Sequence, residues 1–428
     1  MTESKSESKR ALWIAAAAAF STYFCMYAFR KPFTAAIYED QVAFGTGLKS
    51  MLVLSQLVGY MLSKFIGIKV VSELDRRYRA AAIVILIVVA ELALVLFAFV
   101  PNNLKVVMLF FNGLPLGMIF GFVLSYLEGR KQTEALSAAL CASFIVSSGV
   151  VKSVGQWLIQ DWDVSEFHMP MYTGMIFLIP LFISVWLLQK TPPPSPVDVE
   201  LRRKRLEMFA SDRRRFFSAY WPGLCLLLTV YILLTIIRTI RDDFGVEIWR
   251  DLGVSDEPSI FARSETLIAI LVTALNAVAI CFRDNLKAIR VIVTIMCAAF
   301  ILIVGSTLLQ SLGWISAFAF MVLGGVGLYI PYVAFHTTIF ERILAASHIP
   351  GNLGFLMYLA DSIGYLGYAI VLASKNSLKS QQEILPIFST MLYVAATISV
   401  IFLIAATFYF HKKFSKQPNE KTEPTDQS

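Results

Sequence analysis

Charged residues are scarce in this chain, and their scarcity excludes an ordinary soluble domain. Asp, Glu, Lys and Arg make up 16% of the 428 residues, whereas a soluble globular protein carries about 25%. Hydrophobic residues make up 57%, and the mean hydropathy is +0.67. The composition therefore predicts a polytopic membrane protein.

Several chemical motifs are also missing. The sequence contains no phosphate-binding loop, no HExxH metal motif and no nucleophile–base set. The five cysteines all lie in apolar stretches without pairing or metal-ligand spacing, so we interpret them as small apolar residues. The apolar run after MTESKSESKR is too long for a cleavable signal peptide. We expect no enzymatic activity, no metal and no cofactor.

Twelve apolar stretches have roughly the 20 residues that a bilayer requires. They cover 12–38, 50–70, 80–100, 106–127, 135–160, 171–189, 219–241, 259–282, 290–310, 314–340, 352–374 and 386–410. A segment that begins TPPPSPVDVE divides them six and six, and charged turns at 72–80 and 282–290 recur at the same place in each half. Two parallel six-helix halves are a known transporter design.

We therefore expect an all-α protein with twelve transmembrane helices in two pseudo-symmetric halves. The expected segments are a cytoplasmic N-terminus at 1–11, an N-terminal half at 12–189, a basic central loop at 190–218, a C-terminal half at 219–410 and a disordered tail at 411–428. GGVG at 324–327 lies inside an apolar span, which favours close helix packing.

The net charge of +7 is unevenly distributed. Lys and Arg concentrate in alternate loops, including the central loop and the tail, whereas 161–170 contains neither. The positive-inside rule then places both termini and the central loop in the cytoplasm. Because orientation already explains the basic loops, we expect no nucleic-acid partner. The expected location is the bacterial cytoplasmic (inner) membrane.

Two arginines lie deep in apolar stretches, where a charge near the bilayer centre costs about 2.5 to 3.5 kcal/mol. Each belongs to a polar stripe at helical spacing. The stripes are Tyr23, Tyr27, Arg30 and Thr34, and Tyr231, Thr235, Arg238 and Asp242. Matched stripes early in each half predict a two-fold-related pair of arginines that grips one anion. The alternative is a structural ion pair, for example Arg238 with Asp242.

Other ionisable residues also lie within apolar spans and predict a wet central cavity. The expected substrate contacts are Arg30, Arg238, Tyr27, Tyr23, Tyr231, Lys64, Lys152 and His336. The expected coupling or gating residues are Asp361, Lys152, Asp242 and Asp243.

Each of these residues has a structural alternative. Lys64 could snorkel to the membrane surface, and His336 could be a hydrogen-bonded structural residue. We expect Lys152 and Asp361 to pair across the two halves, either as a switchable pair or as structural glue, and alternatively Asp361 is a proton site. Glu91 is a lone carboxylate in the third span.

The span pattern, the basic central loop and LDRRYRA at 74–80 resemble the major facilitator superfamily. Within it, short segments resemble the organophosphate:phosphate antiporter group, which includes glycerol-3-phosphate and hexose-phosphate carriers. These segments are YAFRKPF at 27–33, SKF at 63–65, Arg238 with Asp243 and Phe244, the spacing of Tyr329, Pro331 and Glu341, and GYLG at 364–367.

In the antiporter group, two arginines bind the substrate phosphate. The resemblance implies this role for Arg30 and Arg238, with Lys64 lining the same site. The chain departs from the group at Phe144, which stands roughly where those carriers have a histidine, and at Asp361, an extra charge. It also resembles an uncharacterised bacterial family of facilitator-like proteins.

These observations predict a monomeric secondary transporter that moves a small organic anion, a phosphate ester or a carboxylate, by alternating access. Arginine suits such a site because its planar fork binds phosphate or carboxylate oxygens in a bidentate way. One alternative is a membrane sensor of the same anion, with the central loop as a signalling surface. Another is a lipid-handling facilitator with a greasy lateral path among its 33 Phe residues.

Overall fold

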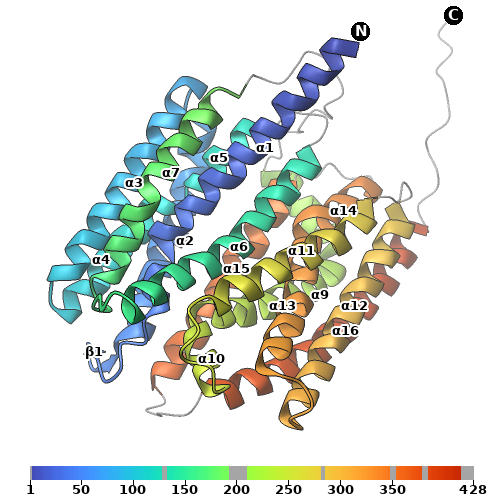
Figure 1. The fold of residues 1–428 in the computed structure, drawn as a ribbon. Helices are drawn as coiled ribbons and strands as arrows, with labels where there is room; N and C mark the ends of the chain where they lie inside the picture. Colours follow the sequence, from blue (N-terminus) through green and yellow to red (C-terminus); the bar gives the residue numbers. More distant parts are fainter. Residues whose placement is uncertain are drawn as a thin grey trace, which may run out of the picture.

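The computed structural model describes residues 2–127, 133–191, 210–280, 285–347, 353–377 and 384–415. Almost all of them are helical, and the helices form two bundles that stand side by side (Figure 1). The blue-to-green bundle is the N-terminal half and the yellow-to-red bundle is the C-terminal half. The expected all-helical fold class is therefore confirmed.

The N-terminal half contains seven α-helices and a short hairpin. Its elements are α1 (Thr2–Arg30), the 3₁₀ helix η1 (Pro32–Ala35), β1 (Val42–Ala43), β2 (Thr46–Gly47), α2 (Leu48–Glu73), α3 (Arg76–Phe99), α4 (Asn102–Leu116), α5 (Ile119–Leu127), α6 (Thr133–Gln160) and α7 (Met169–Gln189). The two strands are antiparallel and pair Val42 with Gly47 and Ala43 with Thr46.

The C-terminal half repeats the long helices and adds a π-helical turn. Its elements are α9 (Ala210–Asp243), α10 (Gly245–Asp251), α11 (Ile260–Ile280), α12 (Asn285–Ser311), α13 (Ala317–Ala334), the π-helix η2 (Phe335–Ile339), α14 (Phe340–Ala346), α15 (Leu353–Ser377) and α16 (Ile384–Ser415). α4 with α5, and α13 with η2 and α14, each form one continuous apolar span.

Nine helical spans among the described residues are long and apolar enough to cross a membrane. The other three expected spans correspond to α1, α11 and α15, which do not meet this test. They nevertheless pack among the nine, with α1 on α6 and α7, α11 on α6 and α13, and α15 on α2 and α9. The count of twelve crossings stays a prediction for these three helices.

Two expected boundaries differ from the structure. The first span does not run to residue 38, because α1 ends at Arg30 and η1 begins at Pro32, which lacks the N–H that a continuing helix needs. Thr34 therefore leaves the α1 stripe, and its hydroxyl donates instead to the Lys31 carbonyl at 2.7 Å. α9 already begins at Ala210, inside the segment expected as the central loop. Residues 192–209 and 416–428 lie outside the described part of the chain.

Glycines allow some helices to touch backbone to backbone. A Cβ on Gly59 would lie 2.3 Å from the Phe110 carbonyl oxygen, and one on Gly113 would lie 2.3 Å from the Gln56 carbonyl oxygen. α2 and α4 therefore pack in direct contact within the first half, as small residues permit in membranes. Between the halves, a Cβ on Gly149 of α6 would lie 2.4 Å from the Phe261 carbonyl oxygen of α11.

The GGVG segment of α13 shows the expected close packing at two of its glycines. A Cβ on Gly325 would meet Ile268 at 2.3 Å, and one on Gly327 would meet Ile303 at 2.4 Å. α13 is accordingly wedged against α11 and α12.

Candidate functional site

The two arginines singled out by the sequence occupy buried positions in opposite halves. Arg30 is the last residue of α1, Arg238 lies in the last two turns of α9, and each is 7% exposed. The Arg30 Cζ lies 3.8 Å from the centre of the Tyr60 ring, and the Arg238 Cζ lies 4.3 Å from the centre of the Tyr332 ring. Such cation–π contacts partly offset the loss of water.

Neither guanidinium forms an ion pair with any described residue. Nε of Arg30 and Nε of Arg238 are buried without a hydrogen-bond partner in the described part of the chain. Arg238 donates one long hydrogen bond, 3.5 Å to the Thr239 hydroxyl. The structural ion pair between Arg238 and Asp242 is therefore wrong, because Asp242 is occupied by two lysines. Buried charges normally have partners, and these two Nε atoms have none among the described residues.

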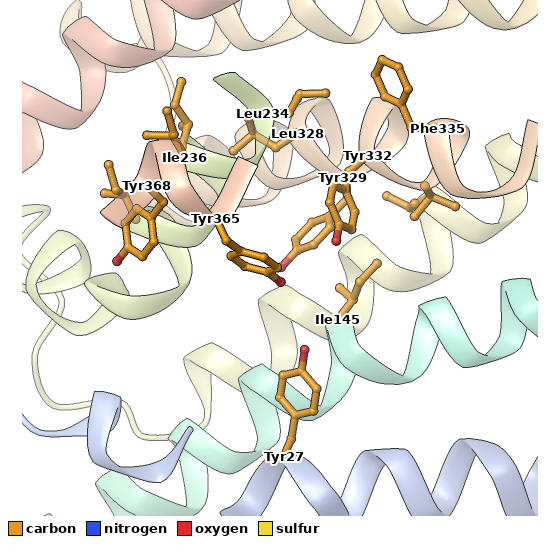
Figure 2. Close-up of a cluster of buried hydrophobic side chains, with 14 of the residues drawn as sticks. Tyr27, Ile145, Leu234, Ile236, Leu328, Tyr329, Tyr332, Phe335, Tyr365 and Tyr368 are labelled. Atoms are coloured by element: carbon orange, nitrogen blue, oxygen red, sulfur yellow. The ribbon is translucent and has the colours of Figure 1, made fainter. Parts of the chain in front are cut away.

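Tyrosines from both halves connect the two arginines. Tyr27 and Tyr365 lie near enough to both guanidiniums to interact with each electrostatically. Tyr27 points from α1 toward Tyr365, Tyr329 and Tyr332 of the other half (Figure 2). The arrangement places phenol groups from both halves beside each guanidinium.

The remaining stripe tyrosines have different neighbours. Tyr23 packs edge-on against Tyr27, with ring centres 5.6 Å apart, and against Phe120 at 5.3 Å. Tyr231 stacks on Tyr332 at 5.7 Å, and its hydroxyl donates to Asp361. Tyr231 therefore contacts a carboxylate instead of an arginine.

Lys64 and Asp361 form an ion pair between the halves, with Lys64 Nζ 2.7 Å from Asp361 Oδ2. The Lys64 side chain is 17% exposed and lies among aromatic rings, so it does not snorkel to the surface. Its Nζ is 5.3 Å from the centre of the Tyr60 ring and 5.0 Å from that of Tyr365. The Arg30 guanidinium also lies over the Tyr60 ring, so Lys64 and Arg30 share one neighbour.

The expected ion pair between Lys152 and Asp361 is wrong. Lys152 Nζ lies 2.5 Å from Asp242 Oδ1 and 2.8 Å from the Ser148 hydroxyl. Asp361 pairs instead with Lys64 of α2. Both pairs join the two halves, but neither is the pair that was expected.

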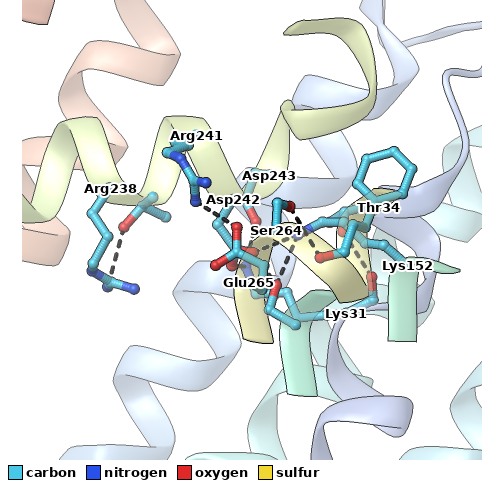
Figure 3. A network of polar contacts seen from close by, with 12 residues as sticks. Lys31, Thr34, Lys152, Arg238, Arg241, Asp242, Asp243, Ser264 and Glu265 are labelled. Carbon is cyan, nitrogen blue, oxygen red and sulfur yellow. Dashed lines mark hydrogen bonds and ion pairs between the residues drawn. The ribbon is translucent and has the colours of Figure 1, made fainter. Parts of the chain in front are cut away.

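A second polar cluster joins the ends of α1 and α9 (Figure 3). Lys31 Nζ lies 2.8 Å from Asp242 Oδ2 and also pairs with Asp243. The Tyr368 hydroxyl donates to Asp243 at 2.9 Å. We call Lys31, Lys152, Asp242 and Asp243 the inter-half ion cluster.

Neighbouring pairs extend the ion cluster. Lys49 Nζ lies 2.6 Å from Glu247 and donates to the Thr34 carbonyl at 3.2 Å, which adds a link from α2 to α10. Arg241 pairs with Glu265 at 2.6 Å within the C-terminal half. These contacts close the protein at the end of α1 that lies away from its N-terminus.

Sequence reasoning missed Lys31, Lys49, Glu247 and Glu265. One signal was present, because Arg30-Lys31 and Asp242-Asp243 are adjacent charged pairs of opposite sign at the ends of matching helices. Lys49 and Glu247 lie near expected loop ends, where charges are common, so sequence alone offered no reason to select them.

Solved structures of transporters share this architecture. The chain is similar to a D-xylose-proton symporter, at 15% identity and a TM-score of 0.61, with 91% of this chain and 97% of that chain covered. It is similar to a bacterial homolog of the human lysosomal transporter Spinster in an inward-facing and unoccupied conformation, at 13% identity and 0.60, covering 95% and 97%. It is also similar to the nucleoside transporter NupG, at 13% identity and 0.58, covering 95% and 100%. The chain therefore has the major facilitator fold.

A family model also matches most of the chain. Residues 32–413 match the model of a family of unknown function (DUF5690), and the chain belongs to that family. No curated protein matches the chain.

Proposed function

We propose that this protein is a secondary transporter that moves a small organic anion by alternating access, with Arg30 and Arg238 as the anion clamp. One observation carries the proposal: two buried guanidiniums, one from each half, lack a carboxylate partner among the described residues, although Asp242, Asp243 and Asp361 lie nearby on the same helices or facing ones. Lysines pair with those carboxylates. The positive charges of the two arginines are therefore not neutralised by them and can attract an anionic ligand.

The chemistry of the clamp favours an oxyanion. Each guanidinium presents a rigid fork of donors that suits phosphate or carboxylate oxygens. Tyr27 and Tyr365 lie near both arginines and supply hydroxyl groups for further hydrogen bonds. A ligand held by both arginines would connect the two halves and reduce the repulsion between two like charges.

The ion cluster supports alternation between two arrangements. Lys31 and Lys152 hold Asp242 and Asp243 across the halves, so the protein is closed at that end. Opening there requires each lysine to leave its aspartate. If both termini are cytoplasmic, as the distribution of Lys and Arg predicts, the closed end faces away from the cytoplasm. The transporters with the same fold add an analogy at the level of fold alone.

Uptake into proteoliposomes tests the proposal. The purified protein is reconstituted and offered a panel of radiolabelled phosphate esters and carboxylates. We expect at least one anion to accumulate in vesicles that contain the wild type or Arg250→Lys, an exposed control. The same anion should not accumulate in vesicles that contain Arg30→Lys or Arg238→Lys. Anion binding without uptake would support the sensor alternative. Uptake that is equal in all four proteins would contradict the clamp.

A further inference from the structure

Asp361 of α15 is surrounded by polar groups from three other elements. Lys64 of α2 pairs with its Oδ2 at 2.7 Å. The Tyr231 hydroxyl of α9 donates to its Oδ1, and His336 Nε2 of η2 lies 3.9 Å from that same oxygen. A single carboxylate therefore has one permanent cation beside it and one histidine that is near but not yet paired.

His336 is hydrogen-bonded through Nδ1, whereas its Nε2 has only a long contact of 3.4 Å with the Tyr231 hydroxyl. Its Nδ1 lies 2.9 Å from the Tyr332 carbonyl oxygen, which can only accept, so Nδ1 carries the proton of the neutral ring. Nε2 is then the basic nitrogen, and it faces Asp361. The residue lies in the π-helix η2 (Phe335–Ile339), a form that is frequent at functional sites.

The surroundings of His336 keep it neutral in the present arrangement. Burial disfavours the charged ring most, Asp361 favours it, and two cations, Lys64 from α2 and Arg238 from α9, add to the effect of burial. The other titratable groups of the cluster are the phenols of Tyr231, Tyr332 and Tyr365, and Asp361 is already neutralised by Lys64. A charged imidazolium here would be a third cation in a largely buried place, because the side chain is 12% exposed.

An anion in the clamp reverses this balance. Lys64 and Arg30 both lie over the Tyr60 ring, at 5.3 and 3.8 Å from its centre. An anion held by Arg30 would lie beside the ring that Lys64 also contacts, and there it would compete with Asp361 for Lys64. Its charge also offsets Arg238 and Lys64, the two cations that disfavour a protonated His336.

We propose that His336 is a proton-binding site coupled to the anion clamp. When an anion draws Lys64 away from Asp361, Nε2 of His336 takes one proton from water, and the imidazolium replaces Lys64 as the partner of Asp361. The Nδ1–H bond to Tyr332 is kept, and no covalent bond other than the new N–H forms. One proton therefore enters with each anion, which makes the proton the coupling ion. This inference rests on the proposed anion transport.

Proton counting during anion binding tests the coupling. Sulfate and methanesulfonate serve as probes, because their charge is constant between about pH 6 and 8, where an ordinary histidine titrates. Binding to the full-length protein is measured by calorimetry in two buffers of different ionisation enthalpy. We expect wild type to take up as much as one proton per anion, and the affinity to fall by up to about tenfold per pH unit as the pH rises.

Three variants separate the roles. His336→Asn retains an amide donor for the Tyr332 carbonyl but cannot take the proton, so we expect anion binding without proton uptake and without pH dependence. His168→Asn is the control, because His168 bonds Ser165 beside α7, outside the cluster, and should match wild type. Asp361→Asn removes the competitor of the anion, so it should bind both probes more tightly at high pH while losing proton uptake.

The outcomes distinguish this inference from the proposed function. Binding that requires Arg30 but is independent of pH, with no proton uptake, would overturn the proton site and leave the clamp intact. Weaker probe binding by Asp361→Asn would overturn the competition for Lys64. If Asp361→Asn does not fold, the comparison of His336→Asn with wild type decides alone. Failure of both probes to bind at any pH would contradict the clamp itself.

Discussion

Lys31, which directly follows α1, and Asp242 of α9 lie 2.8 Å apart, although they belong to different halves of the chain. Arg30 directly precedes Lys31, and Arg238 lies one helical turn before Asp242. The proposed anion clamp and the ion cluster therefore lie at the same two helix ends. A ligand that shifts either arginine acts on a helix that also carries part of the cluster.

The first prediction concerns the strength of this ion pair. Lys31→Ala leaves Asp242 and Asp243 with less compensation in a buried place, so it should lower the free energy of unfolding in detergent by about 3 to 5 kcal/mol. The double variant Lys31→Ala/Asp242→Ala should lose less than the sum of the single variants. The exposed pair of Arg77 and Asp75 is the control, and its cycle should give about 0 to 1 kcal/mol. Strictly additive losses at Lys31 and Asp242 would show that the two residues act separately.

The second prediction concerns protection by the ligand. An anion at 100 times its Kd should add about 2.7 kcal/mol of apparent stability to the wild type. Arg30→Lys should reduce this gain, because an ammonium lacks the planar fork of a guanidinium. A thermal-shift screen of phosphate esters and carboxylates on both proteins measures the difference. Identical shifts with every active anion would count against the clamp.

The third prediction concerns Glu91 of α3, which is 6% exposed and has no hydrogen-bond partner on either carboxylate oxygen among the described residues. A charged carboxylate would be very costly there, so the group is a neutral acid and Glu91→Gln should leave stability nearly unchanged. Gly174→Ala should instead destabilise by about 1 to 3 kcal/mol, because its Cβ would lie 1.9 Å from Glu91 Oε2.

A double variant checks the Glu91 and Gly174 contact. Glu91→Ala/Gly174→Ala should recover part of the loss caused by Gly174→Ala, since the clashing carboxyl group is gone. Unfolding in detergent, monitored by circular dichroism, measures all four proteins. A large loss for Glu91→Gln would mean that the carboxylate is charged and has a partner.

The fourth prediction compares two helical glycines. Gly59→Ala should destabilise the protein strongly, because the new Cβ would lie 2.3 Å from a backbone oxygen of α4 that cannot move aside alone. Gly305→Ala in α12 is the matched control, because no atom lies within 4 Å of its new Cβ. We expect the control to be neutral, or more stable by about 0.5 to 1 kcal/mol because the helix loses a flexible residue. Equal thermal stability of the two variants would contradict the close packing of α2 and α4.

The fold class and the burial of Arg30 and Arg238 could be predicted from the sequence because both depend on local pattern. Long apolar stretches indicate spans, and a repeated spacing of Tyr and Arg indicates a shared helix face. The partners of Lys152 and Asp361 could not be predicted, because helical spacing gives the face of a residue but not its depth relative to residues of another helix. Asp242 lies on α9 at the depth of Lys152, while Asp361 on α15 meets Lys64.

Two local departures from a regular α-helix also limit what residue spacing can predict. Pro32 ends α1 immediately after the clamp arginine, so the stripe that was extended to Thr34 fails at its last member. The π-helical turn at Phe335–Ile339 alters the spacing around His336, and nothing in FHTTI marks it in advance. Apolar periodicity presumes a regular helix, and both departures lie next to residues of the candidate site.

The contact between Gly149 and the Phe261 carbonyl oxygen has a mechanical consequence. If the two halves rock against each other, as the proposed alternating access requires, they need a point of contact, and a backbone-to-backbone contact has no side chain that could move aside. α6 and α11 can therefore tilt or slide at this point but cannot approach further. Any side chain at position 149 would push α6 and α11 apart. The size of that side chain would then affect the angle between the two bundles.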